Sequence, residues 1–308
     1  MKSFLLNSSF ALLLLTPSNV FAETLCPGSV TLVQYHLLQS SLIATSVNVN
    51  GSGPFEFMVD TGAQITVVDP ALADDLKLKV NGSIGVVAFN SYEKVPLVSA
   101  AVVEAGPVAV HDLQMAVEGL EQLQAWNPKL RGVLGNNFLS RFDLLIDRGH
   151  KMLCFDDSRQ MQRAVRGERV SLLVKASQPG EIVFTQPVLV SVHLPGDGRK
   201  GTVLRLDSGA NVPILFVDRN ADSLPWLQMN RMIRGSTVGN AARVSYAVTP
   251  VRAVKFTAHQ QMQVAFFTPI NAGQTFAKGG EDGLLPITLF KRVLISMTDH
   301  FVMFDPQS

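Results

Sequence analysis

The sequence has little charge, and the charge that it has is balanced. Only 17% of its 308 residues are charged, and 26 basic residues stand against 25 acidic ones. No cluster of lysine and arginine is interleaved with aromatic residues, so nothing indicates nucleic acid or an anionic membrane as a partner. Hydrophobic residues reach 47%. Such a chain folds around a core, and its length is enough for two domains of ordinary size.

Common catalytic motifs are also missing. The six histidines show no HExxH or paired-ligand spacing, no Gly-x-Ser-x-Gly segment occurs, and no glycine-rich phosphate loop precedes a helix. The two cysteines, Cys26 and Cys154, form no CxxC pair, so we expect neither a metal nor a cofactor. They leave two alternatives open, a disulfide that closes a long loop around the first half or two buried thiols, because a sequence does not give the Cα separation that a bridge requires.

Long hydrophobic runs are absent beyond the N-terminus. Lys2 precedes a largely apolar stretch from Phe4 to Leu15, and Val20-Phe21-Ala22 places small or aliphatic residues at the −3 and −1 positions of a cleavage site. The apolar stretch is too short to span a bilayer comfortably. We expect residues 1–22 to be a signal peptide that is cleaved after Ala22. The mature chain is then exported, to a periplasm or out of the cell, with no membrane association after cleavage.

One short pattern occurs twice. Phe57-Met58-Val59-Asp60-Thr61-Gly62-Ala63 is echoed by Leu204-Arg205-Leu206-Asp207-Ser208-Gly209-Ala210, with the aspartates 147 residues apart (207 − 60). An aspartate beside apolar residues is costly unless its oxygens accept hydrogen bonds, and the glycine allows a tight turn that brings backbone N–H groups to them. A single copy is typical of an ordinary turn. Two copies half a chain apart indicate a duplicated domain, in which each half brings one aspartate to a shared site.

A second pattern closes each half. Gly132-Val133-Leu134-Gly135 precedes a predicted short helix (136–142) and a hairpin (144–155). Gly283-Leu284-Leu285-Pro286 precedes a predicted helix (287–292) and two strands (293–297 and 301–304).

The remaining chain is rich in predicted strands. They cover 32–50, 55–59, 80–117 with breaks at 81–82, 90–91 and 106–107, 170–174 and 188–192. A short helix is predicted at 71–76, after Asp69-Pro70. The charged stretch 156–169 is interpreted as a solvated connection rather than a surface helix.

The ordered set of apolar-Asp-Thr/Ser-Gly-Ala, followed later in each half by apolar-apolar-Gly and a short helix, resembles the aspartic proteases. Within them it is similar to the retropepsin-like group, because Gln64-Ile65-Thr66 and Asn211-Val212-Pro213 stand where pepsin-like enzymes usually carry serines and an aromatic residue. The resemblance covers nearly all of the mature chain. It implies an all-β, bilobal fold with a few short helices and the active site between two β-barrel lobes. We expect an N-terminal lobe (23–160), a linker (161–180) and a C-terminal lobe (181–308).

The resemblance also implies the chemistry. Two carboxylates a few ångströms apart cannot both ionise easily, so Asp60 and Asp207 would hold one proton between them. The ionised member would activate a water, and the neutral member would donate to the scissile carbonyl. The residues that support the active-site loops would be Thr61, Gly62, Ala63, Ser208, Gly209 and Ala210.

We therefore expect an exported aspartic endopeptidase. It would act as a monomer on a polypeptide bound as an extended strand, with no cofactor and no nucleic acid. The sequence identifies no substrate-binding residue beyond two candidate flap hairpins, 82–98 and 235–251, which contain Tyr92 and Tyr246.

Two residues depart from the pattern. Pro286 stands where the second lobe should carry a counterpart of Gly135, and its ring and missing N–H are expected to distort the support of that lobe. Arg205 is expected to point outward to solvent, whereas an inward side chain would stabilise the ionised carboxylate and lower activity. These departures leave an alternative open, a catalytically inactive peptide-binding or structural protein with the same fold. In a further alternative, each lobe pairs with a lobe of another chain.

Overall fold

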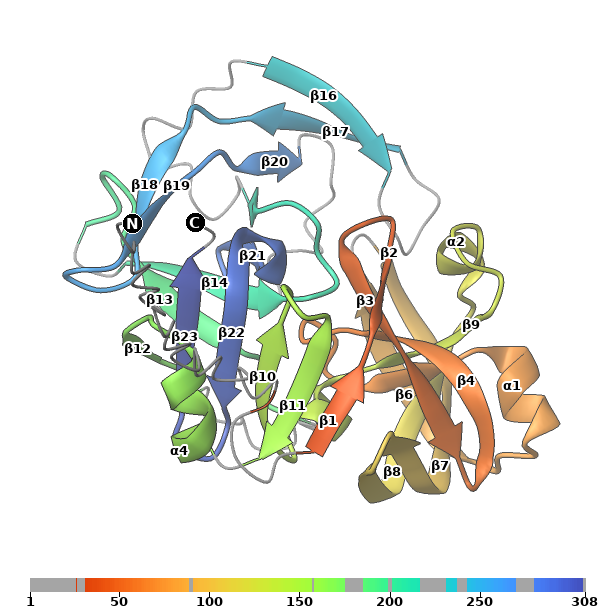
Figure 1. Cartoon of the computed structure of the whole chain (residues 1–308). Coiled ribbons are helices and arrows are strands. Elements are labelled where there is room, and N and C mark those ends of the chain that lie inside the picture. The colour runs from red at the N-terminus through yellow and green to blue at the C-terminus, as the bar shows by residue number, and fades with distance from the viewer. Residues whose placement is uncertain are drawn as a thin grey trace, which may run out of the picture.

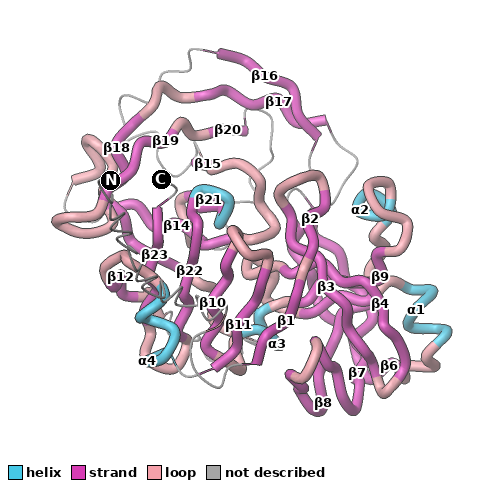
Figure 2. The backbone as a smooth tube through the Cα atoms, in the orientation of Figure 1, coloured by secondary structure: helices cyan, strands magenta, loops and turns pink. Residues whose placement is uncertain are grey.

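The computed structural model describes residue 26 and residues 31–88, 91–156, 158–174, 185–198, 201–216, 231–236, 243–269 and 280–306. These residues form a protein of strands with a few short helices (Figure 1, Figure 2). The all-β prediction is therefore confirmed. The predicted signal peptide lies outside the described residues. Within them, no helix combines the length and the apolar character needed to cross a membrane.

The first lobe is an eight-stranded sheet with the order β2-β3-β4-β9-β5-β8-β7-β6. Its strands are β2 (His36–Leu38), β3 (Leu42–Val49), β4 (Ser52–Val59), β5 (Thr66–Val68), β6 (Val80–Ala88), β7 (Ser91–Ala105), β8 (Val108–Val117) and β9 (Leu130–Leu134). An additional pairing of β3 with β7 closes the sheet on itself. Two short helices lie in its connections, α1 (Pro70–Asp75) and α2 (Glu121–Gln124), and a third, α3 (Asn136–Leu139), follows β9.

The second lobe is a seven-stranded sheet with the order β13-β14-β21-β15-β20-β17-β16. Its strands are β13 (Leu189–Val192), β14 (Thr202–Asp207), β15 (Ile214–Leu215), β16 (Arg231–Ser236), β17 (Arg243–Val248), β20 (Phe267–Pro269) and β21 (Gly283–Pro286). A separate hairpin is formed by β18 (Arg252–Lys255) and β19 (Gln261–Val264). The short 3-10 helix η3 (Ile287–Leu289) follows β21 directly.

The two lobes repeat one strand order. Without β2, the first sheet reads β3-β4-β9-β5-β8-β7-β6, which corresponds strand by strand to the second sheet. In both lobes the strand that leads to an aspartate, β4 or β14, pairs in parallel with the strand that carries the second sequence pattern, β9 or β21. The repetition seen in two short motifs is thus a repetition of the whole sheet.

A third sheet joins the two halves of the chain. Its order is β1 (Thr31–Gln34), β11 (Met152–Asp156), β10 (Asp143–Asp147), β22 (Phe290–Ser296), β23 (Phe301–Pro306) and β12 (Arg169–Ser171). Three strands come from each half, and β10 pairs with β22 across the middle, as Figure 1 shows. The stretch predicted as a linker, 161–180, contributes β12 to this sheet.

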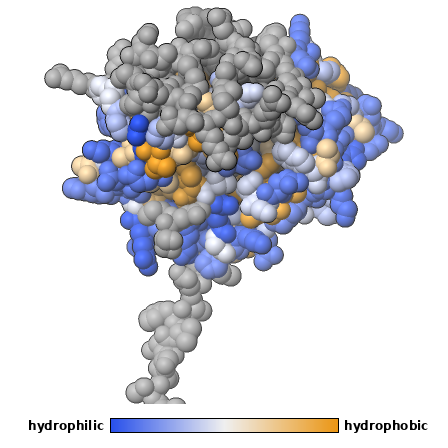
Figure 3. Space-filling model, turned by 90° about the horizontal axis from the view of Figure 1, so that it is seen from above, coloured by the Kyte–Doolittle hydropathy of each residue, from blue (hydrophilic) through white to orange (hydrophobic). Residues whose placement is uncertain are grey.

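One apolar core runs through both lobes and the third sheet, and includes Phe57, Leu204 and Val293. Viewed from above in Figure 3, the coloured surface is mostly hydrophilic, and its largest hydrophobic group lies left of the centre. The described residues expose only a few large hydrophobic side chains, which are Val80, Trp126, Leu173, Val174 and Val251.

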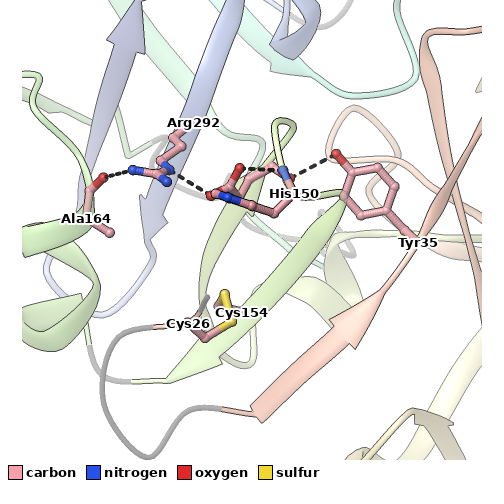
Figure 4. Close-up of polar contacts among 7 residues, drawn as sticks. Cys26, Tyr35, His150, Cys154, Ala164 and Arg292 are labelled. Atoms are coloured by element: carbon pink, nitrogen blue, oxygen red, sulfur yellow. Dashed lines mark hydrogen bonds and ion pairs between the residues drawn. A yellow bond between two sulfur atoms is a disulfide. The ribbon is translucent and has the colours of Figure 1, made fainter. Parts of the chain in front are cut away.

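A disulfide ties the start of the described chain to the third sheet. Cys26 and Cys154 are bonded, with their Cα atoms 5.9 Å apart and 128 residues between them in sequence (Figure 4). Cys154 lies on β11 and is fully buried. Of the two alternatives that the sequence leaves open, the structure has the disulfide.

Local sequence signals account for several elements. Helix α1 starts as predicted, because the Asp69 side chain accepts a hydrogen bond from the Leu72 amide at 3.0 Å and Pro70 is the first helical residue. The predicted break at Asn81-Gly82 is wrong, because β6 continues through these residues with a shift of register against β7. A bulge lets a strand accommodate an irregular pair without ending.

Two further predictions need correction. The stretch 156–169 is not an irregular connection, because it contains α4 (Ser158–Met161) and η1 (Gln162–Ala164), and Met161 is fully buried in an apolar cluster. The helix predicted at 287–292 ends at Leu289, and β22 begins at Phe290. The aromatic and β-branched residues that follow fit a pleated, half-buried strand better than a helix.

Candidate active site

The two repeated aspartates lie side by side where the lobes meet. Asp60 directly follows β4, and Asp207 is the last residue of β14. A Cβ atom added to Gly62 would lie 2.5 Å from the Cγ of Asp207, and one added to Gly209 would lie 2.6 Å from the Cγ of Asp60. Each glycine therefore lies against the carboxyl group of the opposite lobe, and a larger residue has no room there. The two carboxyl groups also share a hydrogen bond.

The hydroxyl residues after the aspartates bind the two loops together crosswise. The Ser208 hydroxyl donates to the Val59 carbonyl at 2.8 Å and accepts from the Thr61 amide at 2.9 Å. The Thr61 hydroxyl donates to the Leu206 carbonyl at 2.9 Å and accepts from the Ser208 amide at 3.0 Å. Both residues are buried. These four bonds cross the lobe interface, so the position of each loop depends on the other.

Backbone amides of the turns bind the carboxyl groups. Gly62 donates to Asp60 Oδ1 at 2.8 Å. In the second lobe, Gly209 and Ala210 donate to Asp207 Oδ1 at 2.8 and 2.9 Å. Each carboxyl group is therefore fixed by its own turn, as expected for the Asp-Thr/Ser-Gly-Ala sequence.

The environment gives the two carboxyl groups different acidities. Burial raises the pKa of Asp60, but hydrogen bonds from the Gly62 amide and from Asp207 act in the opposite direction. Burial and the negative charge of Asp60 raise the pKa of Asp207 well above its usual range. Both effects disfavour a second negative charge at the site. The two carboxyl groups therefore favour a state in which they share one proton.

Two asparagines that the sequence analysis did not single out support the first loop. The Asn136 side chain donates to the Thr61 carbonyl at 2.7 Å. Asn137 Oδ1 accepts from the Thr66 amide and hydroxyl at 2.8 and 2.7 Å, and the Thr66 hydroxyl accepts from the Gly135 amide at 3.2 Å. The side chains of Asn136, Asn137 and Thr66 are all buried. Their signal in the sequence is a pair of amides directly after an apolar strand, where apolar residues would be expected.

The second lobe lacks both the donor and the acceptor of the hydrogen bond between the Gly135 amide and the Thr66 hydroxyl. Pro286 has no N–H, and the registers of β5 on β9 and β15 on β21 make Pro213 the counterpart of Thr66. The donor and the acceptor are therefore lost together, and no buried group is left unpaired by the exchange. Pro286 continues the parallel pairing opposite Asp207. The expected distortion of this strand is absent.

The prediction for Arg205 is wrong. Its side chain is only 19% exposed and forms an ion pair with the buried Glu281. Its Nη1 donates to the Gly62 carbonyl at 2.9 Å, in the aspartate loop of the other lobe. Side chains two residues apart on a strand share a face, so Arg205 points to the same side as Asp207.

The candidate flaps are hairpins, as expected. They are formed by β6 with β7 and by β16 with β17, and their tips (89–90 and 237–242) lie outside the described residues, as does the Tyr92 side chain. Tyr246 is buried and packs edge to face on Phe267, with ring centroids 6.3 Å apart. It therefore serves the packing of β17 on β20.

The Thr185 hydroxyl, which the sequence did not indicate, donates a hydrogen bond at 3.0 Å to the carbonyl of Gln64, next to the first aspartate loop. Among the described residues, no group of three or more histidine, cysteine, aspartate or glutamate side chains could hold a metal ion.

A polar cluster around the buried Asp147 carboxylate connects third-sheet strands from the two halves of the chain (Figure 4). The Asp147 carboxylate accepts from Arg292 Nε at 2.7 Å and from His150 Nδ1 at 2.9 Å. Its backbone carbonyl accepts from the Tyr35 hydroxyl at 3.3 Å, and Arg292 also donates to the Ala164 carbonyl at 3.0 Å. Burial acts to raise the pKa of Asp147, but the hydrogen bonds from His150 and Arg292 outweigh it and hold the pKa below its ordinary value. The carboxylate is thus ionised and joins both halves of the chain.

Comparison with known families agrees with this geometry. Residues 45–141 match the family model described as "gag-polyprotein putative aspartyl protease". Over this range the chain is similar to the retropepsin-like aspartic proteases, which supports the family that the sequence motifs predict. No curated protein sequence matches the chain significantly.

The matched range spans β4 to α3 and so contains the first aspartate loop, the first candidate flap and the second sequence pattern. The retropepsin-like match supports a protease function and the all-β fold of the predicted family. The match does not favour the alternative of a catalytically inactive protein with the same fold.

Proposed function

We propose that the protein is an exported aspartic endopeptidase in which Asp60 and Asp207 form one active site per chain. The observation that carries the proposal is the close pairing of two buried carboxyl groups, one from each lobe, each bound by its own turn and lying against the glycine of the other. The same arrangement makes Thr61, Gly62, Ala63, Ser208, Gly209 and Ala210 the residues that support the loops.

The different acidities of the two carboxyl groups suggest their roles. Asp60, the ionised member, removes a proton from a water between the carboxyl groups, and the water oxygen attacks the carbonyl carbon of the scissile peptide bond. Asp207, the protonated member, gives its proton to the carbonyl oxygen, which yields a tetrahedral diol. On collapse, Asp60 passes its proton to the leaving nitrogen and Asp207 takes one back from a diol hydroxyl. The carbon–nitrogen bond breaks, and the pair regains its single shared proton.

The proposal extends to the substrate and the cellular setting. An extended polypeptide fits a site covered by hairpins, because such a segment can pair with a strand through its backbone. The site draws on two lobes of one chain, which supports a monomer. The disulfide supports export, because disulfides persist in oxidising compartments.

The inactive alternative lacks a specific observation in its favour. It was motivated by Pro286 and Arg205, yet Pro286 keeps its strand in register and Arg205 lies in an ion pair beside the site. An inactive protein would still bind peptides after Asp60→Asn, with no turnover to lose.

The test is cleavage of a denatured general protein substrate from acid to neutral pH by the chain that starts at Glu23. Asp60→Asn and Asp207→Asn are compared with Asp112→Asn, which changes an exposed aspartate with positive φ to a residue that tolerates this conformation. We expect cleavage that pepstatin inhibits, that either site variant abolishes and that the control retains. A well-folded wild type that cleaves nothing at any pH would refute the proposal.

A further inference from the structure

Arg205 makes the two halves of the site chemically different. It lies on β14 two residues before Asp207, and Met58 holds the same place before Asp60 in the first lobe. Its ion-pair partner, Glu281, lies two residues before Gly283, and the corresponding residue before Gly132 is Leu130. Met58 and Leu130 belong to one buried apolar cluster. A buried apolar pair in one lobe is thus replaced by a charged pair in the other.

The contacts of Arg205 bring its charge to both catalytic loops. Its backbone belongs to the strand that ends at Asp207, and its Nη1 hydrogen-bonds the carbonyl of Gly62 at 2.9 Å. The amide of the same glycine donates to Asp60. The guanidinium group therefore connects the strand of one carboxyl group with the turn of the other. At 19% exposure, little solvent screens its charge.

The charged groups that face Arg205 among the described residues are few. They are Glu281, in the segment before β21, and the two site carboxyl groups. Its neighbours on the adjacent strands β13 and β21 are Leu189 and Leu284. Asp282 lies next to Glu281, but its carboxylate accepts a hydrogen bond from the Val203 amide at 2.8 Å.

A cation near two coupled carboxyl groups favours their ionised forms. The positive charge of Arg205 lowers the pKa of both Asp60 and Asp207, against the larger effect of burial. The negative charge of Glu281 partly cancels this influence. An aspartic dyad is active only while it holds one proton, so the balance of the two charges affects the pH range of activity.

We propose that Arg205 and Glu281 are a positioning pair for the dyad, which ties the first catalytic loop to the second lobe and sets the pH at which the enzyme works. The inference rests on the proposed protease function. It concerns residues that act through the two aspartates and not on the substrate itself.

The test compares pH profiles of kcat/KM for charge variants with opposite expected effects. In Arg205→Met a cation is lost and Glu281 remains, so both limbs of the profile move to higher pH. In Glu281→Gln the cation is left uncompensated, so both limbs move to lower pH. We expect activity one pH unit beyond the basic midpoint of the wild type to rise about threefold or more in the first variant and to fall by a similar factor in the second.

Two further variants serve as controls. Arg205→Lys keeps the charge and is expected to retain the midpoints of the wild type, with a lower kcat from the lost hydrogen-bond geometry. The double variant Arg205→Met/Glu281→Leu copies the apolar pair of the first lobe and removes both charges. A single variant that leaves one charge buried could fail to fold, whereas the double variant, which leaves none, is expected to fold. Its pH midpoints are expected to shift less than those of Arg205→Met.

The outcomes separate this inference from the proposed function. Shifts of the pH midpoints in opposite directions in the two single variants support the positioning pair. If a single variant fails to fold, a shift of the midpoints to higher pH in the double variant supports it instead. If the variants lower activity equally at every pH and leave the midpoints in place, the pair only braces the loop and the inference is wrong. A wild type without cleavage at any pH overturns both proposals, whereas an active wild type with unshifted profiles overturns only this one.

Discussion

Removing the Ser208 hydroxyl should cost far more stability than its size suggests. Ser208→Ala deletes one oxygen that accepts from the Thr61 amide at 2.9 Å and donates to the Val59 carbonyl at 2.8 Å. Ser208 is 0% exposed, so water cannot easily replace these bonds. Leaving a buried backbone group unpaired costs about 1–3 kcal/mol. Two such groups predict a loss of about 2–6 kcal/mol in the free energy of unfolding.

The measurement is urea unfolding followed by circular dichroism, for Ser208→Ala and for the matched control Thr61→Ser. The control removes a methyl group at the symmetric position and keeps the hydroxyl bonds to Leu206 and Ser208. It should lose no more than about 1.5 kcal/mol, as for other buried methyl groups. A loss below about 0.5 kcal/mol in Ser208→Ala, with unchanged m-value, would contradict the view that the crosswise bonds hold the loops together.

Three other predictions concern the framework around the site. Gly135→Ala should destabilise by about 1–3 kcal/mol, because its Cβ would lie 2.5 Å from the Ile65 carbonyl oxygen, whereas Gly82→Ala, with nothing within 4 Å, should be tolerated in the same thermal-unfolding assay. Arg292→Met should cost about 3–5 kcal/mol at neutral pH, because it removes one cation from the buried Asp147 carboxylate. The pKa of the Asp147 carboxylate is lowered in the folded protein, so its contribution to stability is present above its unfolded pKa and is lost as the pH falls through its folded pKa. The cost of Arg292→Met should therefore shrink in acid. An equal cost at every pH would refute this, as would an equal cost from changing the exposed neighbour Lys291 to Met. Reduction of the disulfide, which spans 128 residues, should lower the free energy of unfolding by about 2–5 kcal/mol, and identical unfolding curves with and without reductant would contradict its role.

The fold was predictable because the strongest sequence signals are local and are repeated. The Asp-Thr/Ser-Gly-Ala turns, the apolar runs before them and the Asp69-Pro70 helix start each depend on few residues. The duplication then extends these local signals to both lobes. The weaker predictions concern boundaries, such as Asn81-Gly82, where a bulge replaces a turn. A turn dipeptide does not reveal whether its neighbouring strand can continue past it.

The errors at the site arise from contacts between segments far apart in the sequence. Arg205 was expected to face solvent, although strand alternation places it on the face of Asp207, and only the position of the other lobe shows that this face is covered. Pro286 looked disruptive when considered alone. Aligning the two halves gives the missing information, because Pro213 replaces Thr66 and removes the partner that the lost N–H would have needed.

The sequence also did not show the polar network under the first loop. Asn136 and Asn137 follow a strand and could have been ordinary helix-start residues, because asparagine favours such positions. Their roles depend on the Thr61 carbonyl and on Thr66, which lie about 70 residues earlier in the chain (137 − 66 = 71). Hydrogen bonds of this range have no local sequence signature.

The central claim is that one chain forms one active site from its two halves. The most direct test mixes purified Asp60→Asn with Asp207→Asn and measures cleavage of a denatured substrate at the optimum pH of the wild type. We expect each variant alone to be inactive and the mixture to stay inactive, because each chain contains one damaged dyad. Recovery of activity in the mixture would show that intact sites form between chains, and activity in either single variant would show that the dyad is not the catalyst.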